Sequence, residues 1–156
     1  MRVSEFMTTH VISVTPDTPV HEVAETLEKF HFTGIPVVDG KKVVGLIAER
    51  DFITSGSDLY LPTYIKLLTD MDFVSGDNSK LPKEAQAIIN AKAKDIMNKQ
   101  LVTISPEASL EELAETFAVK RVNPIPVIDK EGNMLGIISR SDLIKLFSKK
   151  NLYAAL

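Results

Sequence analysis

Apolar residues recur at helical spacing in two stretches of the chain that lie 90 residues apart. The first set is Val20, Val23, Ala24, Leu27 and Phe30, and the second is Leu110, Leu113, Ala114 and Phe117. Apolar residues repeated every three or four positions lie on one face of a helix, so the pattern predicts an amphipathic helix at each place. Thr18 is expected to cap the first helix, with Pro19 at its first position. Ser109 and Glu112 form a predicted capping box at the second helix.

Short runs of branched apolar residues follow each helix. Residues 35–38 and 43–47 flank a turn at Asp39-Gly40, and residues 125–128 and 134–138 flank a turn that contains Gly132-Asn133. This arrangement predicts a β-hairpin after each helix. A short extended piece, 11–14 or 101–104, precedes each helix, and a second helix is expected after each hairpin, at about 49–55 and 140–149. The predicted order is strand, helix, strand, strand, helix in both stretches.

The two stretches are copies of one repeat. Residues 7–39 align without a gap with residues 97–129, and after one extra residue 45–47 align with 136–138 and Asp51 with Asp142. One repeat of about 50 residues has a marginal core, so the two are expected to pack together across a pseudo-two-fold axis as an α/β (α+β) fold. The predicted domains are repeat 1 over 1–55, a helical segment over 56–94 and repeat 2 over 95–156.

The helical segment between the repeats is predicted to contain two helices, near 58–68 and 81–91, with a loop at 75–79. Extension of the core is the favoured role, because apolar residues at helical spacing are usually buried. Contact with a partner protein or with the mouth of a cleft is the alternative.

The composition excludes several classes of function. Apolar residues make up 44% and charged residues 25% of the chain, which is typical of a globular domain. There is no cysteine, so disulfides, a thiol nucleophile and a thiolate metal site are excluded. His10, His21 and His31 have no ligand spacing, so no metal site is expected. The net charge of −3 without a basic block gives no support for nucleic-acid binding.

Neither a membrane segment nor a catalytic arrangement is expected. No apolar run approaches the ~20 residues that span a bilayer, so a cytoplasmic protein is predicted. Nothing links a serine to a histidine base, and Glu111, Glu112 and Glu115 are typical of a solvated helix face. The chain is therefore not expected to be an enzyme.

Residues 136–144 are the stretch with the clearest candidate chemistry. A buried strand is predicted to run directly into a helix that begins with Ser139, Ser141 and Asp142. The start of a helix favours an anion such as phosphate, and a carboxylate there could accept hydrogen bonds from two sugar hydroxyls. The same residues fit a capping box, which only starts a helix. Asp51 is kept in repeat 1 although Ala48 replaces the serine, which favours the ligand interpretation.

The doubled motifs resemble those of a tandem pair of cystathionine-β-synthase (CBS) domains, a Bateman module. The motifs are a Thr/Ser-Pro turn, Ile-Pro-Val-(Val/Ile)-Asp and Gly-(Leu/Ile)-Ile-x-x-x-Asp. The resemblance covers nearly the whole chain apart from about 55–93. It implies a compact pseudo-symmetric α/β pair, often dimerised, that binds adenine nucleotides or S-adenosylmethionine for regulation and has no catalytic cofactor.

The resemblance also implies two clefts and their residues. In one, Asp142 would hold ribose hydroxyls and Ser139 and Ser141 would contact phosphate. The rest of this cleft would be formed by Ile12, Ser13, His31, Thr33, Gly34 and Ile35. The other cleft would be formed by Asp51, Arg50, Val102, Thr103, Lys120, Arg121, Val122, Asn123, Pro124 and Ile125. Because Ala48 lacks a hydroxyl and Glu49 repels an anion, the Asp142 cleft is the favoured one.

These observations predict a regulatory module that senses an adenosine-containing ligand of the AMP, ADP or ATP class, with AMP favoured. A homodimer of such pairs and an unidentified effector protein are the expected partners. A module that only dimerises or binds a protein, without any ligand, is the alternative. S-adenosylmethionine and NAD are the other ligands considered.

Overall fold

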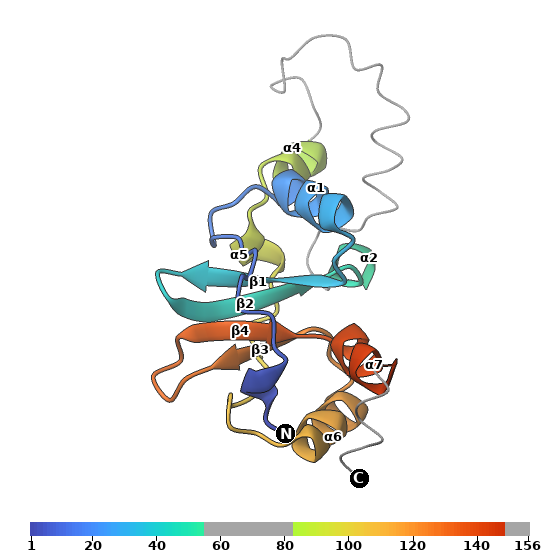
Figure 1. Ribbon diagram of the computed structural model, residues 1–156. Helices are drawn as coiled ribbons and strands as arrows, with labels where there is room; N and C mark the ends of the chain where they lie inside the picture. Colours follow the sequence, from blue (N-terminus) through green and yellow to red (C-terminus); the bar gives the residue numbers. More distant parts are fainter. Residues whose placement is uncertain (55–82, 149–156) are drawn as a thin grey trace. The chain divides into compact units, whose positions relative to one another are not determined.

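The computed structural model describes residues 1–54 and 83–148 (Figure 1). The helix expected near 58–68 lies outside these residues. The elements within residues 1–54 are η1 (Val3–Glu5), α1 (Val20–Phe30), β1 (Gly34–Asp39), β2 (Lys42–Ala48) and α2 (Asp51–Thr54). The later elements are α4 (Lys83–Ile89), α5 (Ala93–Ile96), α6 (Leu110–Lys120), β3 (Ile125–Ile128), β4 (Met134–Ile138) and α7 (Arg140–Ser148). The predicted helix, hairpin and second helix are confirmed in both repeats.

Each repeat has a two-stranded sheet, β1 with β2 and β3 with β4. The strands β3 and β4 are antiparallel, with Ile125 opposite Ile138 and Val127 opposite Gly136. The expected extended pieces contribute only one bridging residue each, because prolines follow soon after. Val14 bridges Val37, and Ile104 bridges Val127, both in the parallel sense.

The chain forms two compact units that interleave along the sequence. The Asp142 unit contains Met1–Ile12, Gly40–Val43 and Gln100–Leu156, and the Asp51 unit contains Ser13–Asp39 and Val44–Lys99. The helix and most of the hairpin of repeat 1 therefore belong to one unit, while the segment that leads into repeat 1 belongs to the other.

Each repeat begins with a leading segment, which is Met1–Ile12 in repeat 1 and the stretch up to Lys99 that contains Asn98 in repeat 2. Each leading segment is hydrogen-bonded to the other repeat. In the Asp142 unit, Thr8 and Ile137 exchange two backbone hydrogen bonds of 2.9 Å, and the Val3 amide donates to the Ala108 carbonyl at 3.0 Å. In the Asp51 unit, Asn98 and Leu46 exchange the equivalent pair at 2.9 and 3.1 Å. The two leading segments are thus exchanged in the same way.

Each unit has its own apolar core. The core of the Asp142 unit contains Val3, Ile104, Leu113, Phe117, Ile125, Val127 and Ile138. That of the Asp51 unit contains Val14, Val23, Leu27, Ile35, Val37, Ile47, Ala93 and Ile96. Phe30 belongs to the apolar pattern of the first predicted helix, whose members are expected to lie on its buried face, but it is 42% exposed. It lies in the last turn of α1 and stacks on Phe32, with ring centroids 5.3 Å apart.

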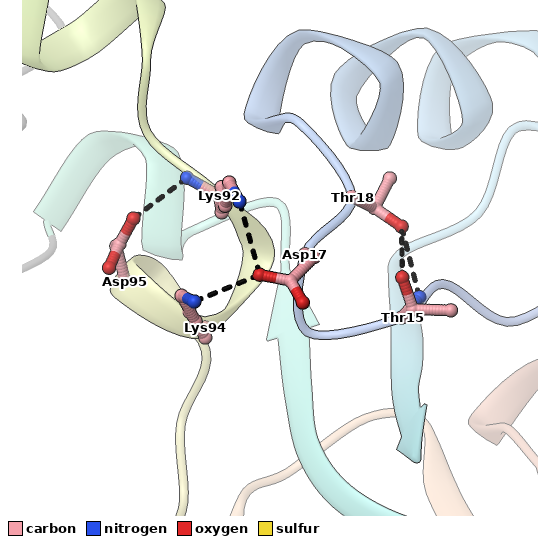
Figure 2. A network of polar contacts seen from close by, with 6 residues as sticks. All are labelled: Thr15, Asp17, Thr18, Lys92, Lys94 and Asp95. Carbon is pink, nitrogen blue, oxygen red and sulfur yellow. Dashed lines mark hydrogen bonds and ion pairs between the residues drawn. The ribbon is translucent and has the colours of Figure 1, made fainter. Parts of the chain in front are cut away.

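The two main helices begin differently. The capping box of α6 is confirmed: Glu112 N donates to the Ser109 hydroxyl at 3.2 Å, and Ser109 N donates to the Glu112 carboxylate at 2.7 Å. The predicted Thr18 cap is wrong, because Pro19 is the N-cap residue of α1. The Thr18 hydroxyl instead accepts a hydrogen bond from Thr15 N at 3.0 Å and closes the turn before the helix (Figure 2).

The same turn carries a small charge cluster that joins it to α5. Asp17 Oδ1 accepts hydrogen bonds from Lys94 Nζ at 2.8 Å and Lys92 Nζ at 3.2 Å, while Asp95 accepts one from Lys92 N (Figure 2). Lys94, and then Lys92, hold the pKa of Asp17 below its ordinary value. The ionised Asp17 therefore stabilises the fold at any pH above the pKa that this carboxyl has in the unfolded chain. The contribution is lost as the pH falls through the lower pKa of Asp17 in the folded protein.

Replacing Asp17 with asparagine is expected to lower the melting temperature slightly at pH 7 and not at all well below pH 4. The effect is small because all three side chains are largely exposed, and added salt should reduce it further. Melting curves of wild type and Asp17→Asn at both pH values, with and without salt, check this. A difference that persists at low pH would mean that the substitution acts on the turn and not on the charges.

Candidate functional site

The start of α7 in the Asp142 unit carries a closed network of short polar contacts. Asp142 Oδ2 accepts hydrogen bonds from Ser139 N at 2.9 Å and from the Ser139 hydroxyl at 2.7 Å. The Ser139 and Ser141 hydroxyls are 2.6 Å apart and share a third hydrogen bond. Arg140 N donates to the Asn123 side-chain oxygen at 2.9 Å. The sequence at the end of β4 thus places two hydroxyls and a carboxylate together.

Asp142 has capacity for further hydrogen bonds. Its other oxygen, Oδ1, accepts one bond from Lys145 Nζ at 3.2 Å, and the Lys145 side chain is 71% exposed. A carboxylate can accept about four hydrogen bonds, so Oδ1 retains a position for an incoming hydroxyl. The Asp142 side chain is itself 18% exposed and can be reached from solvent. Asp142 can therefore accept a hydrogen bond from a sugar hydroxyl.

The equivalent site of the Asp51 unit is simpler. Asp51 Oδ2 accepts a hydrogen bond from Ala48 N at 2.7 Å, the counterpart of the bond between Ser139 N and Asp142. Backbone capping alone therefore explains why Asp51 is kept, and its presence does not favour a ligand, contrary to the sequence argument. What distinguishes the two sites is the pair of hydroxyls, which Ala48 and Arg50 do not provide.

Two predicted residues contact the start of a second helix or the turn before it within their own unit. Asn123 bonds the backbone of Arg140 in the Asp142 unit, and the Thr33 carbonyl accepts from Glu49 N at 3.2 Å in the Asp51 unit. Asn123 and Pro124 are joined by a cis peptide bond. The resemblance assigns Asn123 to the Asp51 cleft and Thr33 to the Asp142 cleft, and these assignments stay predictions.

The two residues that end α1 and α6 have left-handed backbone conformations. His31 has φ 53° and Arg121 has φ 52°, and both are exposed. His31 N bonds the Glu28 carbonyl at 3.2 Å, as expected of a helix end. The Arg121 side chain lines a pocket of about 600 Å³ together with Ala114, Phe117, Ala118 and Arg140. A phosphate contact from either residue stays a prediction.

The other predicted residues differ in how much of each is exposed. Gly34, Ile35, Pro124 and Ile125 are buried, so they offer mainly backbone to a ligand. Half-buried positions are Val102, Thr103 and Val122, and exposed ones are Ile12, Ser13, Thr33 and Arg50.

Sequence reasoning missed two side chains at this site. Lys145 lies three residues after Asp142 on α7 and pairs with it, which the i, i+3 spacing could have indicated. Arg140 lies between the two serines and lines the pocket beside α6, and no sequence signal distinguishes it. Within residues 1–54 and 83–148 there is no group of three or more His, Asp or Glu that could hold a metal ion. Nor does any helix in this part of the chain have the length and apolar character needed to cross a membrane.

These features define a protein built from two α/β repeats, each with a helix, a hairpin and a carboxylate-capped second helix. The chain belongs to the CBS domain family, whose model matches residues 3–58 and 93–149. CBS-domain pairs are generally regulatory modules.

Curated relatives are just over a quarter identical to this chain within the aligned residues. An inosine-5′-monophosphate dehydrogenase from Methanocaldococcus jannaschii is 28% identical over 145 residues, which are 92% of this chain and 23% of that protein. Uncharacterized protein MJ1426 from the same organism is 28% identical over 142 residues, which are 86% of this chain and 84% of that protein. The chain thus spans less than a quarter of the dehydrogenase, and the match lies in the CBS portion.

Solved structures of CBS proteins have the same fold. The structure of protein MJ1225 from M. jannaschii has a TM-score of 0.73 and 26% identity, covering 94% of this chain and 47% of that chain. CBSX2 in complex with AMP has a TM-score of 0.70 and 21% identity, covering 95% and 96%. The CBS pair of MJ0100, in complex with 5-methylthioadenosine and S-adenosyl-L-methionine, has a TM-score of 0.68 and 18% identity, covering 96% and 98%.

Proposed function

We propose that the chain is a regulatory module that binds an adenosine-containing ligand at the start of α7, with AMP as the favoured ligand. The observation that carries the proposal is the network of Ser139, Ser141 and Asp142, in which two hydroxyls and a partly exposed carboxylate lie together. Asp142 Oδ1 would accept from the ribose hydroxyls. The serine hydroxyls would turn away from Asp142 and from each other to donate to phosphate. We also propose that the module works as a homodimer and acts on an effector protein.

The related structures support an adenosine ligand in general. CBSX2 binds AMP, and MJ0100 binds 5-methylthioadenosine and S-adenosyl-L-methionine. All three ligands contain adenosine, and they differ in whether an anionic group is attached to the ribose. The paired serines of this chain favour a ligand with a phosphate, because hydroxyls at a helix start are suited to an anion. S-adenosylmethionine and NAD are the remaining candidates.

Replacing Asp142 with alanine is expected to weaken AMP binding at least about tenfold, because a hydrogen bond to a charged group contributes ~1.5–3 kcal/mol. Isothermal titration calorimetry with AMP, ADP, ATP, NAD and S-adenosylmethionine measures the affinities. Asp51→Ala is the matched control: it removes the same backbone cap in the other unit, where no paired hydroxyls are present. Unchanged AMP affinity in Asp142→Ala, or equal losses in both variants, would contradict the proposed site.

A module that binds no ligand is the second candidate, favoured by the fact that the Asp142 network is already closed on itself. The melting temperature distinguishes the two candidates. A ligand at 100 times its dissociation constant adds ~2.7 kcal/mol to the free energy of unfolding. If none of the five compounds raised the melting temperature at millimolar concentration, the ligand-free interaction module would be the better description.

A further inference from the structure

Two methionines lie at equivalent places in the two units, each against a glycine of a hairpin strand. A Cβ atom at Gly136 would lie 2.7 Å from Met7 Sδ, and a Cβ atom at Gly45 would lie 2.4 Å from Met97 Sδ. Each thioether sulfur therefore occupies the space that a side chain at the glycine would fill. The two methionines are separated by the same 90 residues that relate the repeats, so the arrangement occurs once in each unit.

Each methionine covers the edge of a core and stays partly open to solvent. Met7 packs against the core of the Asp142 unit, and Met97 packs against the core of the Asp51 unit. Both side chains are half-buried, and the residues that follow them, Thr8 and Asn98, are exposed. A half-buried side chain leaves part of its surface within reach of a small solute, while its other side is held by apolar contacts.

Methionine is the only sulfur-containing residue of this chain, which has five methionines and no cysteine. A peroxide therefore has thioethers as its most reactive targets. With hydrogen peroxide, the O–O bond breaks, an S–O bond forms, and one oxygen atom passes to the sulfur. The sulfur is oxidised by two electrons and the peroxide is reduced to water. The product is a polar sulfoxide, which methionine sulfoxide reductases convert back to the thioether.

Oxidation at these positions would act directly on the exchanged leading segments. Met7 is followed by Thr8, which exchanges two backbone hydrogen bonds with Ile137, and Met97 is followed by Asn98, which forms the equivalent pair with β2. A polar oxygen placed against an apolar core costs free energy unless it finds a hydrogen-bond partner. The oxidised side chain would therefore move from the glycine to solvent and weaken the adjoining pair of backbone hydrogen bonds.

We propose that Met7 and Met97 are sites of reversible oxidation by peroxide, at which sulfoxide formation releases the leading segment of each repeat from the hairpin of the other. Met134 differs from them in its surroundings. It is half-buried as well, but within residues 1–54 and 83–148 it packs against neither core, so its oxidation would leave both pairings in place. The modification goes beyond the ligand proposal and does not depend on it, since its test needs no nucleotide.

Mild treatment of the folded chain with hydrogen peroxide tests the proposal. Peptide mass spectrometry identifies the oxidised methionines, and amide hydrogen exchange measures the two pairings. In the oxidised protein, the amides of Thr8 and Ile137 and those of Asn98 and Leu46 should exchange at least about tenfold faster. The melting temperature should fall by about 4 °C or more. Treatment with methionine sulfoxide reductases should restore slow exchange.

Leucine substitutions assign each effect to one methionine. Leucine has nearly the volume of methionine and cannot be oxidised in this way, so the variants are expected to fold. Met7→Leu should protect the pairing in the Asp142 unit and leave that of the Asp51 unit sensitive to peroxide, and Met97→Leu should do the reverse. Met134→Leu is the matched control and should leave both pairings sensitive.

Three results would overturn the proposal. One is that Met7 and Met97 stay reduced while Met1, which is 55% exposed, and Met134 are oxidised. Another is oxidation of both sites without faster exchange of the paired amides. The third is faster exchange that persists in the double variant Met7→Leu/Met97→Leu, with circular dichroism showing that it is folded. The reductase treatment needs only the wild type, and slow exchange that it fails to restore would contradict reversible oxidation even if a variant misfolds.

Discussion

Replacing Val3 with alanine is expected to lower the free energy of unfolding by about 1.5–3 kcal/mol, because it removes two buried methyl groups at ~0.8 kcal/mol each and leaves a cavity. Val3 is 0% exposed and lies in the core of the Asp142 unit with Leu113 and Phe117. Its backbone amide is also bonded to Ala108 at 3.0 Å. The expected loss follows from the exchange of segments, because Val3 is buried among residues of repeat 2.

Urea denaturation of the wild type and Val3→Ala measures the difference. Ile12→Ala is the control from the same segment: Ile12 is 38% exposed, and its replacement should change the free energy of unfolding by less than about 1 kcal/mol. Two probes should be followed, because two units with separate cores can unfold in separate steps. Equal effects of the two substitutions would mean that the segment is not held in the core as the structure describes.

Local patterns predicted most of the fold. The helices α1 and α6 and both hairpins were predicted because each buries one face, and the spacing of apolar residues within a single element records which face that is. The Ser109 capping box was predicted for the same reason, since both partners lie within four residues. The prediction that Thr18 caps α1 was wrong, because a threonine before a helix can close a turn as well as cap the helix. The local sequence does not distinguish these two roles.

The exchange of leading segments could not be predicted. The two segments are copies of one another, with Val3 equivalent to Ala93 and Thr8 to Asn98. Either segment has an apolar residue and backbone groups suited to either hairpin, so the pattern within a segment does not identify its partner. Only contacts between distant residues, such as Thr8 with Ile137, decide the pairing.

The candidate site was predicted in part. Sequence reasoning singled out Ser139, Ser141 and Asp142, and the structure places their oxygens in one network. The presence of Asp51 in repeat 1 was also interpreted as a sign of ligand binding. Its hydrogen bond from Ala48 N is enough to explain a carboxylate at this position. A carboxylate at the start of a helix can act as a cap or as a ligand contact, and both roles produce the same sequence pattern.

The close approach of the leading segment makes Gly136 the second sensitive position. A Cβ atom at Gly136 would lie 2.7 Å from Met7 Sδ and 2.8 Å from the Thr8 carbonyl oxygen, which also accepts the Ile137 amide. Gly136→Ala is therefore expected to lower the free energy of unfolding by about 1–3 kcal/mol, the typical cost of overpacking. Urea denaturation measures it. The equivalent Gly45→Ala would place its Cβ 2.4 Å from Met97 Sδ and should also destabilise the protein.

Replacing the neighbouring methionine shows whether a side chain or the backbone requires glycine at positions 45 and 136. Met97→Ala removes the two atoms that would lie closest to a Cβ at Gly45 and keeps the Met97 Cβ at 2.9 Å. The double variant Gly45→Ala/Met97→Ala should therefore recover part of the loss caused by Gly45→Ala, measured against Met97→Ala alone. Met7→Ala cannot do the same for Gly136→Ala, because the Thr8 carbonyl oxygen is part of the backbone and stays at 2.8 Å. Equal recovery in both pairs would show that the side chain of Met7, and not the backbone of the leading segment, requires glycine at position 136.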